Sequence, residues 1–462
     1  MRCLLLLCLL FSCTQSQALD RYKVEGYLLP NGLQVLMKPG DDRSHVAIRL
    51  VVGVGFDDFA CNERELPHLL EHLLFSGIDG SGEGGLEERM QALGGEWNAF
   101  TSDNDTTFVI EAPAANQRKV LDLLLEVVTK TTIDEKALDI SRRIVEREDG
   151  GHYSHLQRWL DKQGVGHAAS DQLAMELGLK CTERSPVRDM TLAQVEAVRK
   201  HWYAPNNMTL IVVGGLDKVL PAYLERTWAS LDAVKPTDHP DIPVTLHSAA
   251  QQRTLSLGWL GDGAKLHWFF PEPELNDDVP DAALDLVQVY MEWALYKELR
   301  LDHELSYGPW SQREAMGDTG LLSLNADLDR ADVDRARQLV AEMIARLKKD
   351  GLDAATFERL RQATISRQAW SVQGNSQLAD FYWNALSSYA NGRFEDPARD
   401  LRKVTLAQAD AAMRQVFKGP GYVRIEQPLL SYDQLYSLGV VVLVLAGLAV
   451  LGWGALRHNK RH

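Results

Sequence analysis

The amino-acid sequence predicts an α+β fold with two similar domains, each a mainly antiparallel sheet covered by helices. Segments with the two-residue period of strands alternate with segments that have helical spacing. Thr-Leu-Ala-Gln at 191–194 recurs at 405–408, which indicates an internal duplication. Prolines interrupt any regular element in 232–246, so we expect a linker there between an N-terminal domain, 19–231, and a C-terminal domain, 247–428.

Local patterns predict the elements of the first domain in order. Residues 27–37 place Pro-Asn-Gly between apolar runs, which is a hairpin signal. Residues 46–54 alternate in polarity, which predicts a strand with one buried face. Farther along the chain we expect helices over 86–93, 116–128 and 134–149, an extended segment over 97–110 and a strand over 208–213.

The repeat has a matching context in both halves. Each copy follows Arg-x-x and fits a capping box that opens a helix. The expected helices end in aromatic residues, Trp202 in the first half and Phe417 in the second. This shared context favours duplication over coincidence.

Residues 68–72 read His-Leu-Leu-Glu-His, the most informative motif in the chain. Pro67 is tolerated only in a first helical turn, so we expect the helix to begin at 64–66. Positions i, i+3 and i+4 of a helix share one face, so His68, Glu71 and His72 should lie together. Leucines would bury the opposite side of this helix. The alternative is a solvated helix face with two ordinary histidines.

Two imidazoles and a carboxylate form the ligand set of a zinc hydrolase, with a fourth position open for water. Zinc lowers the pKa of that water to about 7, and a nearby carboxylate can take its proton. The His-x-x-Glu-His order is the inverted signature of zinc peptidases. The second half has no such motif at the corresponding place, so we expect one Zn²⁺ per chain.

From these motifs the chain resembles the pitrilysin/insulinase family of zinc metallopeptidases, in the short two-domain form related to mitochondrial processing peptidase. The resemblance covers roughly residues 24–425. The matching pieces are Leu-Pro-Asn-Gly-Leu at 29–33, His-Leu-Leu-Glu-His at 68–72, Phe-Ser-Gly at 75–77, Gly-Gly-Glu-Trp-Asn-Ala-Phe-Thr at 94–101 and Tyr-Ala-Pro-Asn-Asn-Met at 203–208.

The resemblance implies that Glu148 is the third zinc ligand, because the family has a glutamate at this distance beyond the second His. Glu146 and Asp149 are close neighbours in the sequence, and Glu146 would point to a different helix face. Seven positions before the ligand the family usually has another glutamate, which supports the metal site. This chain has Ser141 there, which alters that support and lowers the expected zinc affinity.

The resemblance also assigns the residues that act on substrate. Glu71 is the implied general base. Arg300 and Tyr307 are the implied partners of the scissile carbonyl and the substrate main chain. An edge strand that binds the peptide as an added strand is implied at Asn98, Ala99 and Phe100.

Two departures from the family pattern stand near these residues. Many relatives have glycine three residues before the first His, where this chain has Glu65. Relatives often have a glycine-rich turn before the Arg/Tyr pair, whereas residues 289–300 contain no glycine. The contribution of the second domain is therefore expected to be reshaped.

Two segments predict a membrane location. Residues 1–18 fit a signal peptide, although Leu-Phe-Ser-Cys at 10–13 also resembles a lipoprotein box. Residues 438–456 carry no charge and nearly span a bilayer core of about 30 Å, so we expect a transmembrane helix over 436–457. The basic tail, 458–462, should stay cytoplasmic, which places the rest on the periplasmic side of the inner membrane.

Together these features predict a membrane-anchored zinc endopeptidase that cleaves peptides or unfolded segments. A homodimer is the simplest assembly, and a heterodimer with a zinc-less paralogue is the other. The alternative function is an inactive, membrane-tethered binding or quality-control subunit. The formal net charge of −15, without a basic stripe, argues against nucleic acid. Cys61 and Cys181 are the cysteines of the expected mature chain, and their pairing cannot be read from the sequence.

Overall fold

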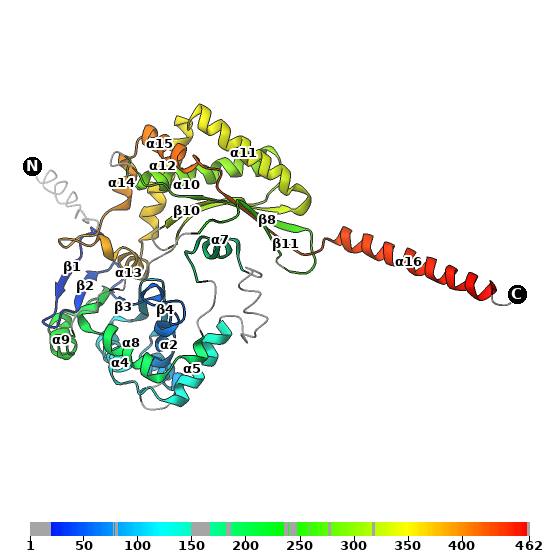
Figure 1. Cartoon of the computed structure of the whole chain (residues 1–462). Helices are drawn as coiled ribbons and strands as arrows, with labels where there is room; N and C mark the ends of the chain where they lie inside the picture. Colours follow the sequence, from blue (N-terminus) through cyan, green and yellow to red (C-terminus); the bar gives the residue numbers. More distant parts are fainter. Residues whose placement is uncertain are drawn as a thin grey trace, which may run out of the picture.

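A computed structural model describes residues 20–76, 78, 82–148, 167–181, 186–234, 239, 247–256, 258–275, 279–316 and 319–459. It consists of two lobes, with helix α16 projecting away from the second lobe (Figure 1). The expected signal peptide, most of the expected linker and the end of the expected cytoplasmic tail lie outside the described residues.

The first lobe is built on a sheet with the strand order β1-β2-β6-β3-β5-β4. Strands β2 and β6 pair in parallel, and the other neighbours pair antiparallel. The strands are β1 (Glu25–Leu28), β2 (Gln34–Pro39), β3 (His45–Val52), β4 (Glu96–Thr101), β5 (Thr106–Pro113) and β6 (Met208–Gly214). One face is covered by α2 (Leu66–Leu74), α3 (Gly82–Ala92), α4 (Gln117–Lys130), α5 (Glu135–Glu148), α8 (Leu192–Trp202) and α9 (Leu220–Thr227).

The second lobe repeats this architecture with the strand order β7-β11-β8-β10-β9. Strands β7 and β11 pair in parallel, and the other neighbours pair antiparallel. The strands are β7 (Gln252–Ser256), β8 (Gly263–Pro271), β9 (Trp310–Met316), β10 (Thr319–Asp329) and β11 (Tyr422–Gln427). One face is covered by α10 (Ala282–Leu295), α11 (Val333–Asp350), α12 (Ala354–Ser371), α14 (Pro397–Lys403) and α15 (Leu406–Val416).

The two halves exchange one helix each. Helix α13 (Asn375–Asn384) comes from the second half of the sequence but packs on the open face of the first sheet. Helix α7 (Ala169–Leu177) comes from the first half and packs on the second sheet. Figure 1 shows both helices between the lobes. Each sheet is therefore covered on both faces, and the exchange ties the lobes together.

A buried arginine anchors each exchanged helix. Arg49 on β3 is 1% exposed and pairs through Nε with Asp380 of α13 at 2.8 Å. Arg424 on β11 is fully buried and pairs through Nη2 with Glu176 of α7 at 2.5 Å. A buried charge is stable only when it is paired, so each contact holds its helix in a defined position.

This exchange corrects the expectation of a strand with one buried face over 46–54. Strand β3 is buried on both faces: Val46, Ile48 and Leu50 face the main core, whereas Ala47 and Val51 contact α13. The alternation in polarity did not predict the second buried face, because α13, the helix that covers it, lies more than 300 residues away in the sequence.

The duplicated motif has the same local structure in both halves. Thr191 and Thr405 each cap a helix, accepting a hydrogen bond of 3.3 Å from the backbone N–H of Gln194 and Gln408 respectively. Both form capping boxes, as the sequence predicts. The two-domain α+β fold with mixed, mainly antiparallel sheets is thus confirmed.

Helix α16 (Tyr432–Asn459) is apolar and exposed. Its segment Tyr432–Leu451 has a mean hydropathy of 2.3, and none of the most apolar window is buried by the rest of the chain. By length and composition it is long enough to cross a membrane. It begins at Tyr432, one turn before the start expected at residue 436, and runs to Asn459.

Candidate metal centre

Helix α2 places both histidines of the motif on one face. It begins at Leu66 with Pro67 in its first turn, and its leucines are buried in the core of the first lobe. This burial fixes the rotation of the helix, so His68 and His72 point together out of the core. Helix α5, which packs against α2, ends at Glu148.

The three predicted ligands meet at one point. The Nε2 atoms of His68 and His72 lie 3.2 Å apart. Glu148 Oε2 lies 3.1 Å from His68 Nε2 and 3.2 Å from His72 Nε2. Ligands about 2.0–2.1 Å from a tetrahedral zinc ion are about 3.3 Å from one another, so the donor atoms have the spacing that zinc requires.

The charges around His68 also suit a cation. Burial by itself would lower the pKa of His68, but a hydrogen bond to Glu65 and the surrounding negative charge raise it above the ordinary value. The negative charge comes from Glu65, Glu71 and Glu148. The donor set and its surroundings therefore fit a bound Zn²⁺.

Glu65 orients the first ligand. Its Oε2 lies 2.9 Å from His68 Nδ1, so a proton on Nδ1 leaves Nε2 free to bind metal. Ser141, where relatives usually have a glutamate, is buried on α5. Glu65 thus supplies a carboxylate partner to His68. The sequence did contain a signal for this contact, because Glu65 lies three residues before His68, a spacing that puts two side chains on the same helix face. The sequence analysis noted Glu65 only as a replacement for the glycine of relatives.

Replacing Glu65 with Ala should weaken zinc binding about 10–100-fold, because His68 loses the partner that fixes its tautomer and orientation. Glu65→Gln keeps an acceptor without the charge and should cause a smaller loss. Competition with a chromophoric chelator measures both. The matched control is Glu63→Ala, since Glu63 accepts a hydrogen bond of 3.0 Å from Gln194 instead. Equal zinc affinity in the wild type and Glu65→Ala would contradict this role.

Glu71 lies near the predicted ligands, since its negative charge contributes to the raised pKa of His68. It is 8% exposed, and its Oε2 accepts a hydrogen bond of 2.8 Å from Thr101 Oγ1. Thr101 closes strand β4, so the end of that strand holds the carboxylate in place. Sequence reasoning included Thr101 in a family motif but assigned it no role.

Asn98, Ala99 and Phe100 lie on β4, which is an edge of the first sheet. Phe100 is 47% exposed. Unpaired backbone groups on an edge strand can pair with an added peptide. Because the same strand ends at Thr101, a peptide added to it would run toward Glu71.

Arg300 and Tyr307 lie together on the second lobe. The guanidinium of Arg300 donates to the Tyr307 carbonyl at 2.5 Å and lies 4.3 Å from the centre of its ring. Tyr307 is 84% exposed. No hydrogen bond, ion pair or ring contact joins this pair to the zinc ligands within the described part of the chain.

The backbone around this pair is irregular. Arg300 lies in the π-helical segment η6 (Tyr296–Asp302), and Glu304 has a positive φ of 54°. Both features are uncommon and are enriched at functional sites. The glycine-free segment 289–300 is thus the end of α10 followed by its π-helical continuation.

A disulfide joins Cys61 to Cys181, with Cα atoms 5.6 Å apart. It links the turn before α2 to the segment after α7, and so connects the half that carries His68 and His72 to the helix packed on the second sheet. The sequence left this pairing open.

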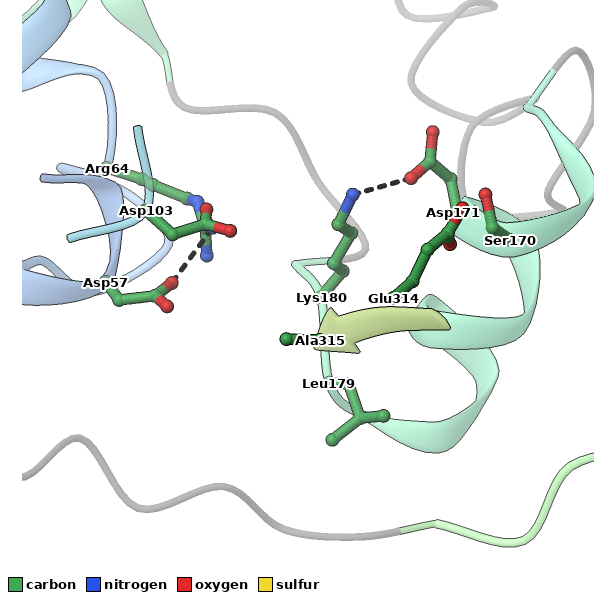
Figure 2. A pocket seen from close by; sticks show the side chains of 9 residues that line it. All are labelled: Asp57, Arg64, Asp103, Ser170, Asp171, Leu179, Lys180, Glu314 and Ala315. Carbon is green, nitrogen blue, oxygen red and sulfur yellow. Dashed lines mark hydrogen bonds and ion pairs between the residues drawn. The ribbon is translucent and has the colours of Figure 1, made fainter. Parts of the chain in front are cut away.

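A cavity of about 350 Å³ is lined by residues of both lobes. Figure 2 shows Asp57, Arg64 and Asp103 on one wall and Asp171, Lys180 and Glu314 on the other. Arg64 pairs with Asp103 at 2.9 Å, and Lys180 pairs with Asp171 at 2.6 Å. The space next to the zinc-binding helix is thus lined by charged groups from both lobes.

Comparison with known proteins identifies the family. Residues 35–165 match the profile described as Insulinase (Peptidase family M16), and residues 189–364 match the profile of the Peptidase M16 inactive domain. The chain belongs to the insulinase family of peptidases. The first match contains the His-Leu-Leu-Glu-His motif. The second match begins near the first copy of the duplicated motif and lies mainly in the C-terminal half, which has no His-x-x-Glu-His motif.

Two bacterial proteins named as zinc proteases align with most of the chain. The uncharacterized zinc protease YmxG of Bacillus subtilis is 22% identical over 85% of this chain and 96% of its own length. The probable zinc protease PqqL of Escherichia coli is 24% identical over 89% of this chain and 42% of its own length. The chain therefore spans nearly all of one relative and less than half of the other.

Two solved protease structures share the fold. A protease from Helicobacter pylori superposes with a TM-score of 0.71 at 18% identity, over 88% of this chain and all of that one. The periplasmic protease PqqL from Escherichia coli gives 0.69 at 19% identity, over 90% of this chain and 49% of that one.

Proposed function

We propose that this chain is a membrane-anchored zinc metalloendopeptidase that cleaves peptides or unfolded segments outside the cytoplasm. The observation that carries the proposal is the convergence of His68, His72 and Glu148, with Glu71 held beside them. Relatives that are named zinc proteases support peptide hydrolysis as the reaction class.

Each residue has a defined role in this proposal. A bound zinc ion would supply a Lewis acid that polarises the scissile carbonyl and lowers the pKa of water to about 7. Thr101 holds Oε2 of Glu71, so Oε1 is the oxygen assigned to take the proton of the attacking water. Glu71 then returns this proton to the leaving amine.

Substrate would bind as an added strand along β4, through main-chain hydrogen bonds at Asn98, Ala99 and Phe100. Main-chain recognition requires an extended peptide and tolerates many side chains. This supports a preference for unfolded segments over folded proteins.

Arg300 and Tyr307 would complete the site from a second lobe. An exposed tyrosine hydroxyl can donate to the developing oxyanion, and an arginine can hold substrate carbonyls. Since no described contact joins the pair to the zinc ligands of its own chain, we assign it to the zinc site of a partner, in a homodimer or in a heterodimer with a zinc-less paralogue.

The location outside the cytoplasm has three supports. Helix α16 is long and apolar enough to span a membrane, and it is followed by basic residues. The Cys61–Cys181 disulfide is typical of oxidising compartments such as the periplasm. One relative of known structure is itself described as a periplasmic protease.

The test uses the full-length protein in detergent, loaded with zinc, on a chemically unfolded protein and on the same protein folded. We expect cleavage of the unfolded form, and cleavage by Glu71→Gln that is at least about 100-fold slower. Bound zinc without Glu71-dependent cleavage would favour the second candidate, a tethered binding subunit. That candidate draws its support from the match of the second half to a domain described as inactive.

A further inference from the structure

A short loop of the second lobe is fastened to the start of α16. The loop lies between β7 and β8 and comprises Gly258–Asp262, which we name the collar loop. Its backbone forms three hydrogen bonds with the segment that leads into α16: Leu429 N to Gly258 O at 3.2 Å, Leu430 N to Trp259 O at 3.1 Å, and Gly261 N to Leu430 O at 3.0 Å.

Further contacts fix the direction in which α16 leaves the lobe. The backbone N–H of Tyr432, the first residue of α16, donates to Asp262 Oδ1 at 3.1 Å. Arg330 donates to the carbonyl of Pro428 at 3.0 Å. The collar loop and the first turn of α16 are therefore held side by side, where α16 emerges from the lobe (Figure 1).

Large apolar side chains are exposed around this junction. Trp259 is 83% exposed, although tryptophan is usually among the more buried residue types. The other members of the patch are Leu260 at 40%, Leu429 at 49%, Leu430 at 39%, Tyr432 at 59% and Tyr436 at 76%. Contiguous exposed apolar surface of this kind marks an interaction site.

The composition and place of this patch select a bilayer as its partner. Tryptophan and tyrosine favour the membrane–water interface, where an apolar ring and a polar N–H or O–H are both accommodated. The patch is continuous with the apolar surface of α16, which begins at Tyr432. Trp259 would thus lie at the same level as the aromatic residues in the first turns of α16.

We propose that the collar loop is a second membrane contact, in which Trp259 and Leu260 enter the bilayer interface beside α16. The proposal rests on the proposed membrane anchoring by α16. Two contacts instead of one would set the tilt of the second lobe, and through the exchanged helices and the disulfide they would orient the zinc-binding lobe on the membrane surface.

The test places the full-length protein in phosphatidylcholine vesicles with and without lipids brominated near the interface, which quench tryptophan fluorescence on contact. Trp453 lies in α16 and is also expected to be quenched. Three variants separate the two signals: Trp453→Phe retains Trp259, Trp259→Phe retains Trp453, and the double variant gives the contribution of all other tryptophans.

We expect the Trp259 component to lose at least as large a fraction of its emission as the Trp453 component. Quenching of Trp453 without quenching of Trp259 would overturn the collar-loop proposal and leave the anchor intact. If brominated lipid quenches Trp453 but not Trp259, and a soluble quencher also fails to reach Trp259, the patch is instead covered by a second copy of the chain or by another protein. Absence of quenching at both positions would refute the anchor itself.

Discussion

Glu71→Gln should reduce kcat for peptide hydrolysis by about 10²- to 10⁴-fold, the usual contribution of a general base. The amide keeps the size of the carboxylate and can still accept the hydrogen bond from Thr101, so the fold around α2 is retained. It cannot accept a proton at neutral pH, which removes the proton transfer alone. Zinc content should be unchanged because Glu71 is not one of the three ligands.

Steady-state kinetics on a fluorogenic peptide, together with metal analysis of the same preparations, measures this prediction. Glu63→Gln is the matched control, since it makes the same chemical change in the turn before α2. A Glu71→Gln variant that retains more than a tenth of wild-type kcat would require another base. A variant that loses its zinc would instead assign Glu71 a role in metal binding.

Removing the disulfide by Cys61→Ser with Cys181→Ser should destabilise the protein by up to about 5 kcal/mol. The cross-link closes a sequence separation of 120 residues, and in the chain-entropy model a loop of this length gives stabilisation of that order. The loss acts on the contact between the lobes, because Cys61 precedes the zinc-binding helix and Cys181 follows α7. The separation of the lobes should therefore vary more in the variant.

Thermal unfolding followed by circular dichroism tests the stability, and small-angle scattering in detergent tests the separation of the lobes. A reductant provides the control. It should lower the unfolding temperature of the wild type toward that of the variant and leave the unfolding temperature of the variant unchanged. Equal unfolding temperatures for oxidised wild type and variant would show that the disulfide adds no stability.

Local features of the fold were predictable because they depend on neighbours in the sequence. Pro67 marked the beginning of α2. The four-residue spacing of His68 and His72 then placed both side chains on one face of that helix. The capping boxes at Thr191 and Thr405 were also local, since each needs only a residue three positions away. The edge position of β4 was available only through the family resemblance.

Features that depend on distant contacts were not predictable in this way. Arg49 is buried against Asp380 on α13, and Arg424 is buried against Glu176 on α7. Because each pair joins residues far apart in the sequence, no local sequence pattern predicted the exchanged helices. Glu148 was assigned as a ligand from family spacing, because the same stretch of sequence also offers the acidic residues Glu146 and Asp149. Glu146 in fact pairs with Arg188 on the neighbouring segment.

The central claim is that His68, His72 and Glu148 together bind one catalytic zinc ion. The direct test is the zinc content of the full-length protein after equilibration with a slight excess of Zn²⁺ and removal of free metal. We predict one zinc per chain in the wild type, and loss of stable binding in His72→Ala and Glu148→Ala. A wild type without zinc, or a full equivalent retained by both variants, would contradict the claim.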